Sequence, residues 1–339
     1  MNLNRLPLLI LFVALMLSAC ASRPQDCARA DVVCAGLVTA SGSINDNDIN
    51  QQAWLGLQDA KTAGLIDRID YIETVDSRDR AKNIDFFAKN GYDVIITVGA
   101  SLYEDTIAAA QKYPNIKFIG VEQEQTEKYS NITGLVFHED QSGFMAGALA
   151  AMITQTNRVA AACEAKFIDS MRRYCEGFQA GARYINPNVK VFLAYREGSQ
   201  ENLFNDPAWG SAAASQMAGD GADILFAAGG GTADAALETA ASQGVHVIGS
   251  ETDVYARLQE IHPQLVSSAI SNIRSGVVDL MRLARGKQLP SGDYFGQVNL
   301  APFHDLENRI SSDVTKKLDA IHSGLENSSI QTGVPYVSP

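Results

Sequence analysis

Short apolar runs alternate with helix-like stretches along the chain, and this alternation limits the possible folds more than any other feature of the sequence. Strands rich in Val and Ile, without alternating polar residues, are typical of a parallel sheet that is buried on both faces. The pattern therefore predicts a doubly wound α/β lobe in the first half of the chain. Its expected strands are residues 33–39, 68–75, 94–98, 116–121 and 132–137, and its expected helices are 50–63, 78–90, 102–112 and 143–154.

The same pattern starts again in the second half. A chain of 339 residues also exceeds the ~250–300 residues at which a single core stops growing. We therefore predict two α/β lobes that face each other across a cleft, with ligand-binding loops at the carboxyl ends of the strands. The second set of strands is expected at 159–163, 189–195, 224–228, 245–249 and 265–269, with helices that include 172–185 and 208–219.

The first twenty residues resemble a bacterial lipoprotein signal. Arg5 precedes an apolar run at 6–17, and small residues then lead to Cys20. A helix that spans a membrane needs about 20 apolar residues, and this run is too short. We expect cleavage before Cys20, lipidation of its thiol, and a membrane-anchored protein that faces the periplasm or the cell exterior. The choice between inner and outer membrane stays open.

Composition shifts suggest where the parts of the chain begin and end. Residues 20–31 are small and polar, which is typical of a tether between a lipid and a folded body. A stretch near the C-terminus has the periodicity of an amphipathic helix and is followed by a polar tail. We expect a signal at 1–19, a tether at 20–31, the first lobe at 32–155 with part of the C-terminal region returning to it, the second lobe at 156–270, crossover and C-terminal helices at 271–325, and a mobile tail at 326–339.

The charge of the chain excludes some partners. Removing the signal, which contains Arg5, leaves 26 of the 27 basic residues against 39 acidic ones, a net charge of −13. Nucleic acid and anionic lipid surfaces would repel such a body, so we expect no nucleic-acid partner and membrane attachment only through the lipid. The acids Glu104, Asp105, Glu122, Glu124, Glu139 and Asp140 are expected to form a solvated face.

If Cys20 carries lipid, four cysteines remain, and an exported compartment permits disulfides between them. The local pairs Cys27–Cys34 and Cys163–Cys175 close the shortest loops and are preferred, although four cysteines allow three pairings. Their spacings lack a Cys-x-x-Cys element and the histidines are scattered, so no metal site is predicted.

A polar segment at residues 38–57 leaves the first strand and enters a helix, with Asp48 in position to cap that helix. This segment resembles the opening motif of the basic membrane protein (BMP/Med) family of ABC-transporter binding lipoproteins, which includes purine nucleoside receptors. Further similarities follow in the same order over nearly all of the remaining chain. They lie at residues 144–151, 177–182 with Asn186-Pro187, 204–207, 230–232 and Asp253.

The resemblance implies two lobes of the periplasmic-binding-protein type I architecture and a set of ligand residues in the cleft. Phe204 matches an aromatic ring that stacks on the ligand base, and Asp253 matches an acid that binds ribose. Three other ligand positions of the family differ here, because they are occupied by Ala40, Ile49 and Ser271. The implied ligand-binding set is Ile49, Asn50, Phe204, Asp206, Gly230, Gly231, Asp253 and Ser271.

The function that follows is a monomeric substrate-binding lipoprotein of an ABC importer, which captures a purine nucleoside between its lobes and delivers it to permease subunits. Alternatives are a nucleobase or a riboflavin-like heterocycle as ligand, or a sensory lipoprotein without transport. No cofactor is expected. An enzyme is disfavoured because the chain lacks a Gly-x-Gly-x-x-Gly fingerprint after its first strand and a Gly-x-Ser-x-Gly elbow.

Overall fold

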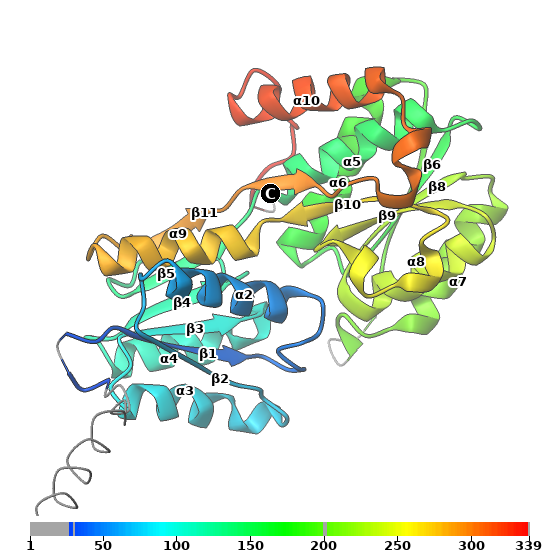
Figure 1. The fold of residues 1–339 in the computed structure, drawn as a ribbon. Coiled ribbons are helices and arrows are strands. Elements are labelled where there is room, and N and C mark those ends of the chain that lie inside the picture. Colours follow the sequence, from blue (N-terminus) through cyan, green and yellow to red (C-terminus); the bar gives the residue numbers. More distant parts are fainter. Residues whose placement is uncertain (1–26, 30, 199–201, 338–339) are drawn as a thin grey trace, which may run out of the picture.

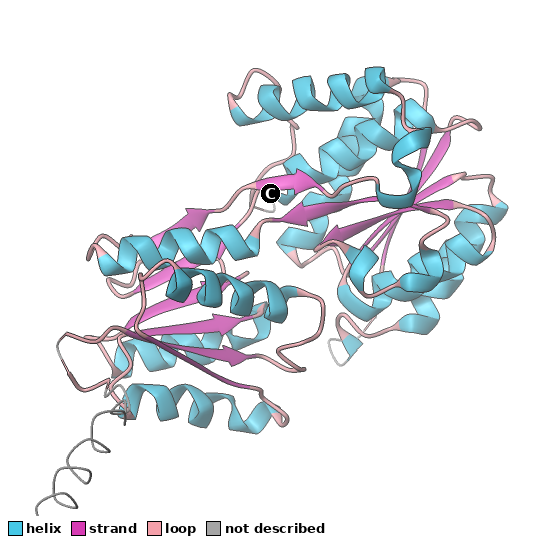
Figure 2. Ribbon diagram, viewed as in Figure 1, coloured by secondary structure: helices cyan, strands magenta, loops and turns pink. Residues whose placement is uncertain are grey.

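The computed structural model describes residues 27–29, 31–198 and 202–337, and these residues fold into two α/β lobes (Figures 1 and 2). The lipidation position Cys20, the signal and most of the expected tether lie outside the described residues. No helix in the described residues is both long enough and apolar enough to cross a membrane.

The first lobe is built on a six-stranded parallel sheet with the order β11-β5-β4-β3-β1-β2. Most strand residues in β1, β3, β4 and β5 are buried, because helices cover both faces of the sheet. Helices α2 and α9 pack together on one face, and α3 and α4 lie on the other (Figure 1). The elements are β1 (Cys34–Thr39), α2 (Ile49–Thr62), β2 (Arg68–Ile72), α3 (Arg80–Lys89), β3 (Val94–Val98), α4 (Tyr103–Lys112), β4 (Lys117–Val121), β5 (Ile132–Val136), α9 (Ile273–Arg285) and β11 (Gly292–Phe295).

The second lobe repeats this design with the order β12-β10-β9-β8-β6-β7, in which only the edge strand β12 runs antiparallel to its neighbour. Its elements are α5 (Glu139–Ile153), β6 (Arg158–Cys163), α6 (Asp169–Ile185), β7 (Lys190–Tyr195), α7 (Pro207–Gly219), β8 (Ile224–Ala228), α8 (Gly230–Ser242), β9 (His246–Glu251), β10 (Leu265–Ser271), β12 (Val298–Leu300) and α10 (Ser312–Glu326). Short 3₁₀ turns occur in both lobes, namely η1 (Ser77–Asp79), η2 (Ala100–Leu102), η4 (Val254–Ala256), η5 (Gln259–Ile261) and η6 (His304–Arg309).

The chain crosses between the lobes after β5, after β10 and between β11 and β12. Helix α5 packs against α6 and β10, so it belongs to the second lobe, although its residues precede the boundary expected at 155. After the second crossing, α9 and β11 return to the first lobe, as the sequence suggested for part of the C-terminal region. The three adjacent crossovers form a hinge between the lobes.

Glycines bring α5 and α6 into unusually close contact. A Cβ atom on Gly147 would lie 1.9 Å from the carbonyl oxygen of Phe178, and one on Gly181 would lie 1.9 Å from the carbonyl oxygen of Phe144. Only hydrogen at these positions lets the two backbones approach so closely. The two glycine-containing motifs noted in the sequence are therefore the two sides of one helix–helix contact.

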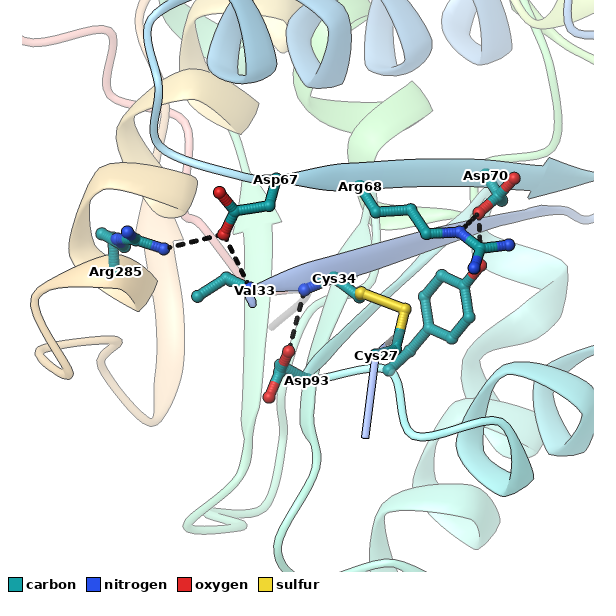
Figure 3. The surroundings of a disulfide bond; sticks show 9 residues. Cys27, Val33, Cys34, Asp67, Arg68, Asp70, Asp93 and Arg285 are labelled. Carbon is teal, nitrogen blue, oxygen red and sulfur yellow. Dashed lines mark hydrogen bonds and ion pairs between the residues drawn. A yellow bond between two sulfur atoms is a disulfide. The ribbon is translucent and has the colours of Figure 1, made fainter. Parts of the chain in front are cut away.

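Two disulfides join the local pairs, Cys27–Cys34 and Cys163–Cys175. Figure 3 shows how the first of them ties the start of the described chain to β1. Carboxylates support the same end of the strand, because Asp93 accepts a hydrogen bond from the Cys34 amide and Asp67 accepts one from the Val33 amide, both at 2.8 Å.

The described part of the expected tail at 326–339 contacts the second lobe. The Thr332 hydroxyl donates to the Asp140 carboxylate at 2.6 Å. Further along, the carbonyl of Tyr336 accepts hydrogen bonds from Arg172 and Arg173, and the Tyr336 ring lies 4.1 Å from the Arg173 guanidinium carbon. Asp140 of α5 and two buried arginines of α6 therefore hold Thr332 and Tyr336 against the second lobe.

Candidate functional site

A cavity of about 300 Å³ lies between the two lobes, where the carboxyl ends of the strands meet. In an open α/β sheet this is the edge at which loops and helix N-termini converge on a ligand. The lobes also touch here, because the Thr252 hydroxyl donates to the Asp48 carboxylate at 2.7 Å. The cavity is lined by Ala100, Tyr103, Glu122, Gln123, Glu124, Thr126, Val136, Glu139, Ile168, Asp169, Ser170, Met171, Phe204 and Glu251.

Two glutamates from opposite lobes give the cavity its chemical character. Glu122 follows β4, and Glu251 is the last residue of β9 and only 8% exposed. Both have left-handed backbones, with φ of 60° and 68° respectively, a conformation that is rare outside Gly and that concentrates at functional sites. Within the described part of the chain, neither carboxyl group has a hydrogen-bond or salt-bridge partner. Carboxyl oxygens in the wall of a cavity can accept hydrogen bonds when no protein group occupies them, so the site is suited to a ligand that supplies donors.

The environment of these glutamates disfavours their charged forms. Burial raises the pKa of Glu122 to about 8, and the nearby charges of Glu139 and Asp48 act in the same direction. Burial also raises the pKa of Glu251 well above its ordinary value, and the charge of Glu122 adds to this effect. Two carboxyl groups that repel each other in a confined space do not both ionise readily at neutral pH.

A third acid in the cavity is compensated. Burial raises the pKa of Glu139 to about 7, although the Arg173 guanidinium lowers it. Arg173 is fully buried and donates from Nε to Glu139 at 2.6 Å, while its other side contacts Glu124 of the first lobe. Arg173 therefore connects the lobes through Glu124 and compensates Glu139, so that Glu122 and Glu251 are the glutamates of this cavity without a partner among the described residues.

Phe204, the aromatic residue expected to stack on the ligand, forms part of the cavity wall. It also has a left-handed backbone, with φ of 63°. Its amide donates to the buried carboxylate of Glu164 at 2.9 Å, and this hydrogen bond fixes its main chain. The ring gives the site one flat apolar surface against which a planar ligand can stack.

Ile49 and Asn50 begin α2 and do not line this cavity. The Asn50 side-chain amide donates to the carbonyl oxygens of Ser41 and Ser43, at 3.1 and 3.3 Å. Asn50 therefore fixes the loop between β1 and α2, and Ile49 packs against the core of the lobe.

Asp206, Gly230 and Gly231 lie behind Phe204. The Asp206 carboxylate caps α7 by accepting from the Trp209 amide at 3.1 Å. A Cβ atom on Gly230 would lie 3.0 Å from the carbonyl oxygen of Phe204, and one on Gly231 would lie 3.3 Å from the same oxygen. These residues shape and support the loop that carries the ring.

Asp253 and Ser271 line a different cavity, of about 650 Å³, between α2, α9 and the ends of β9 and β10. Asp253 accepts a hydrogen bond from the Tyr255 amide and contacts His304 Nε2 at 2.7 Å, and the Ser271 hydroxyl contacts that of Tyr174 at 3.1 Å. Other charged groups in this cavity also have partners, because Asp59 pairs with Arg274 and Asp279 pairs with Arg282. Although this cavity is larger, its charged side chains have partners among the described residues, and the smaller cavity with two acids without a partner is the better candidate site.

Sequence reasoning missed both of these acids. Glu122 was assigned to a solvated face together with Glu139 and Asp140, which is wrong because Glu139 and Asp140 are buried and Glu122 lines the cavity. The position of each acid at the end of an apolar strand was the available signal, since such ends meet at one edge of the sheet. Among the described residues, no group of three or more His, Cys, Asp or Glu side chains is arranged to hold a metal ion.

Comparison with known proteins agrees with this architecture. A family model described as Bmp, ABC transporter substrate-binding protein PnrA-like, matches residues 34–297. A CD4+ T-cell-stimulating antigen of Listeria monocytogenes is 26% identical over 305 residues, which cover 84% of this chain and 83% of the relative. The ABC transporter nucleoside-binding protein BmpA of Lactococcus lactis is 30% identical over 205 residues, or 58% of this chain and 55% of the relative.

Solved structures share the fold. A solute-binding protein of an ABC transporter system from Aeropyrum pernix superposes with a TM-score of 0.71 at 18% identity, covering 88% of this chain and 92% of that one. The two-lobed architecture is thus of the periplasmic-binding-protein type I class, as predicted. Because the family model spans both lobes and the cleft between them, the chain belongs to the Bmp family of PnrA-like ABC transporter substrate-binding proteins.

Proposed function

We propose that the protein captures a purine nucleoside in the cavity between its lobes and presents it to the permease of an ABC importer. The observation that carries this proposal is the combination of one aromatic wall, Phe204, with two acids without a partner, the half-buried Glu122 and the buried Glu251, in the same cavity. A nucleoside has the matching features, namely a flat base that can stack and several N–H and O–H donors.

The acids favour particular ligands within this class. Guanine and hypoxanthine present a ring N–H, and guanine adds an adjacent amino group, so a carboxylate can accept two parallel hydrogen bonds from guanine. Ribose hydroxyls can donate to the second acid, or accept from it while it is protonated. The cavity of about 300 Å³ is at the lower end of the range for ligand pockets, which favours a nucleoside or base over a larger heterocycle such as riboflavin.

Capture requires the lobes to close on the ligand. Three crossovers form the hinge, and residues from both lobes line the cavity, so closure adds contacts from both sides and excludes water. A ligand that contacts both lobes shifts the population toward the closed form, which is the form a permease would recognise. The role is binding rather than catalysis.

Calorimetric titration tests the ligand. We expect guanosine to bind more tightly than inosine, because it offers one more donor, and both to bind more tightly than adenosine, hypoxanthine, adenine or riboflavin. Glu122→Gln and Glu251→Gln should weaken guanosine binding, while the exposed Glu104→Gln should not. If no purine releases heat or stabilises the protein, the nucleoside proposal fails and only the substrate-binding role of the family remains.

Membrane attachment is a separate part of the proposal, and it rests on the signal that ends at Cys20. Lipid chains on this residue would hold the protein at the membrane outside the cytoplasm. Cys20→Ser should appear in the soluble fraction or as an unprocessed precursor. Unchanged attachment of that variant would refute the lipid anchor without affecting the ligand proposal.

A further inference from the structure

Glu164 is a fully buried carboxylate directly after β6, and its two oxygens receive four hydrogen bonds. One oxygen accepts from Arg196 Nε and from the Ala165 amide, the latter at 3.0 Å. The other accepts from the Phe204 amide and from the Thr232 hydroxyl, both at 2.9 Å. One of the four donors therefore belongs to the backbone of the residue that forms the aromatic wall of the cleft.

Thr232 extends this connection. Its hydroxyl oxygen accepts from the Asp206 amide at 2.9 Å while its proton is donated to Glu164. The amides on both sides of Asn205 are thus fixed, one directly by Glu164 and one through Thr232. A left-handed residue such as Phe204 persists only where the surrounding structure holds it in place, and these bonds supply that constraint.

The glycine turn at Gly229 and Gly230, where α8 begins, packs closely against Glu164 and Phe204. A Cβ atom on Gly229, which has φ of 127°, would lie 2.4 Å from the Cβ of Glu164. A Cβ atom on Gly230, which has φ of 53°, would lie 3.0 Å from the carbonyl oxygen of Phe204. The turn thus leaves room for a glutamate on one side and for the Phe204 loop on the other.

We propose that Glu164 is a positioning residue, which holds the Phe204 ring in the wall of the ligand cavity through the Phe204 amide and the Thr232 hydroxyl. This inference rests on the proposed role of Phe204 in binding. The alternative is a purely structural role, in which Glu164 only neutralises the buried Arg196. The two roles differ in their effect on Phe204.

Hydrogen exchange of the ligand-free protein tests the positioning directly. Glu164→Gln leaves two of the four donors without an acceptor, since an amide has one acceptor oxygen. Thr232→Val removes one hydroxyl without changing the charge or shape, so it remains informative if Glu164→Gln does not fold. In both variants we expect amides of residues 204–206 to exchange about tenfold faster or more, while those of β8 change little. Thr232→Ser keeps the hydroxyl and should restore wild-type exchange.

Guanosine titration gives the second readout. Thr232→Val should weaken guanosine binding about tenfold, and Thr232→Ser should not. In a Phe204→Ala background the same Thr232→Val change should have no further effect, because the ring that it positions is gone.

Unchanged exchange at 204–206, or an equal increase in β8, would overturn the positioning role whatever the ligand is. Additive losses of guanosine binding in the double variant would also overturn it. If wild-type protein does not bind guanosine while exchange at 204–206 responds as expected, the nucleoside proposal fails and the structural link from Glu164 to Phe204 stands.

Discussion

Replacing Glu122 with Gln should stabilise the ligand-free protein at neutral and alkaline pH. The pKa of Glu122 is raised from 4.5 to about 8, chiefly by burial. Between these values the folded protein keeps a proton that the unfolded chain has released. Stability therefore falls as the pH rises through this window, and it reaches its full penalty above pH 8. Gln has the same size and no proton to lose, so it removes this penalty.

The size of the effect follows from the shift. At pH 7 the unfolded carboxyl group is 2.5 pH units above its pKa of 4.5, which at 1.36 kcal/mol per unit sets an upper limit of about 3 kcal/mol. Water that reaches the open side of the cavity reduces the penalty, so we expect a gain of about 1–3 kcal/mol at pH 7. At pH 5 the gain should be below about 1 kcal/mol, because the unfolded carboxyl group is then only half a pH unit above its pKa.

Urea unfolding of wild-type and Glu122→Gln protein between pH 5 and pH 9 measures this difference. The gain should grow steadily with pH and level off near pH 8. Glu104→Gln is the matched control, because Glu104 is exposed on α4 and its replacement should leave the free energy of unfolding nearly constant across the range. An equal gain at pH 5 and pH 8, or a loss at pH 8, would refute the reasoning that an ionised Glu122 is penalised in the empty cleft.

Three further outcomes follow from the packing. Gly147→Ala should lower the free energy of thermal unfolding by about 3 kcal/mol, because its methyl group meets the Phe178 carbonyl. Gly219→Ala, with open space around the new atom, should leave this free energy unchanged or raise it slightly. Equal effects of the two variants would contradict the close helix contact. Cys27→Ser with Cys34→Ser should lower the free energy of unfolding by roughly 2.5 kcal/mol under oxidising conditions. In a reducing agent, which also opens Cys163–Cys175 in both proteins, wild type and the double variant should have nearly equal free energies of unfolding. Tyr336→Ala should lower the free energy of unfolding by about 1–2 kcal/mol, because it loses burial and the contact with Arg173. Val337→Ala, at an exposed position, should leave the free energy of unfolding unchanged. If urea unfolding gives the same value for both variants, the C-terminal segment does not stabilise the folded protein.

Much of the fold could be predicted because strand burial and helix periodicity are local properties. The apolar runs at 94–98 and 224–228 correspond to β3 and β8, with the same bounds. The glycine motifs were visible as well, but their meaning was not, since only the packed helices show that Gly147 and Gly181 face each other's backbones. Helix α5 was assigned to the first lobe because it follows the strands of that lobe in sequence, whereas packing places it in the second.

The candidate site could also be predicted only in part from the sequence. Phe204 was found through a resemblance of its local motif, and it lines the cavity. Asp253 and Ser271 were expected beside it, yet they line the neighbouring cavity with partners of their own. Glu251 and Asp253 are two residues apart at the end of β9, yet they line different cavities. A sequence motif does not show which of two neighbouring acids lines which cavity.

The sequence by itself determined the α/β alternation and the duplication into two lobes, because each depends on residues that are close together along the chain. It favoured the local cysteine pairs without excluding the other pairings, and the structure contains the local ones. The tertiary structure alone decided which acids matter. Glu122 and Glu251 are far apart in sequence and become a pair only when two sheets align their strand ends across one cavity. Burial and mutual repulsion then raise their pKa values, and both effects depend on surroundings that exist only in the folded protein.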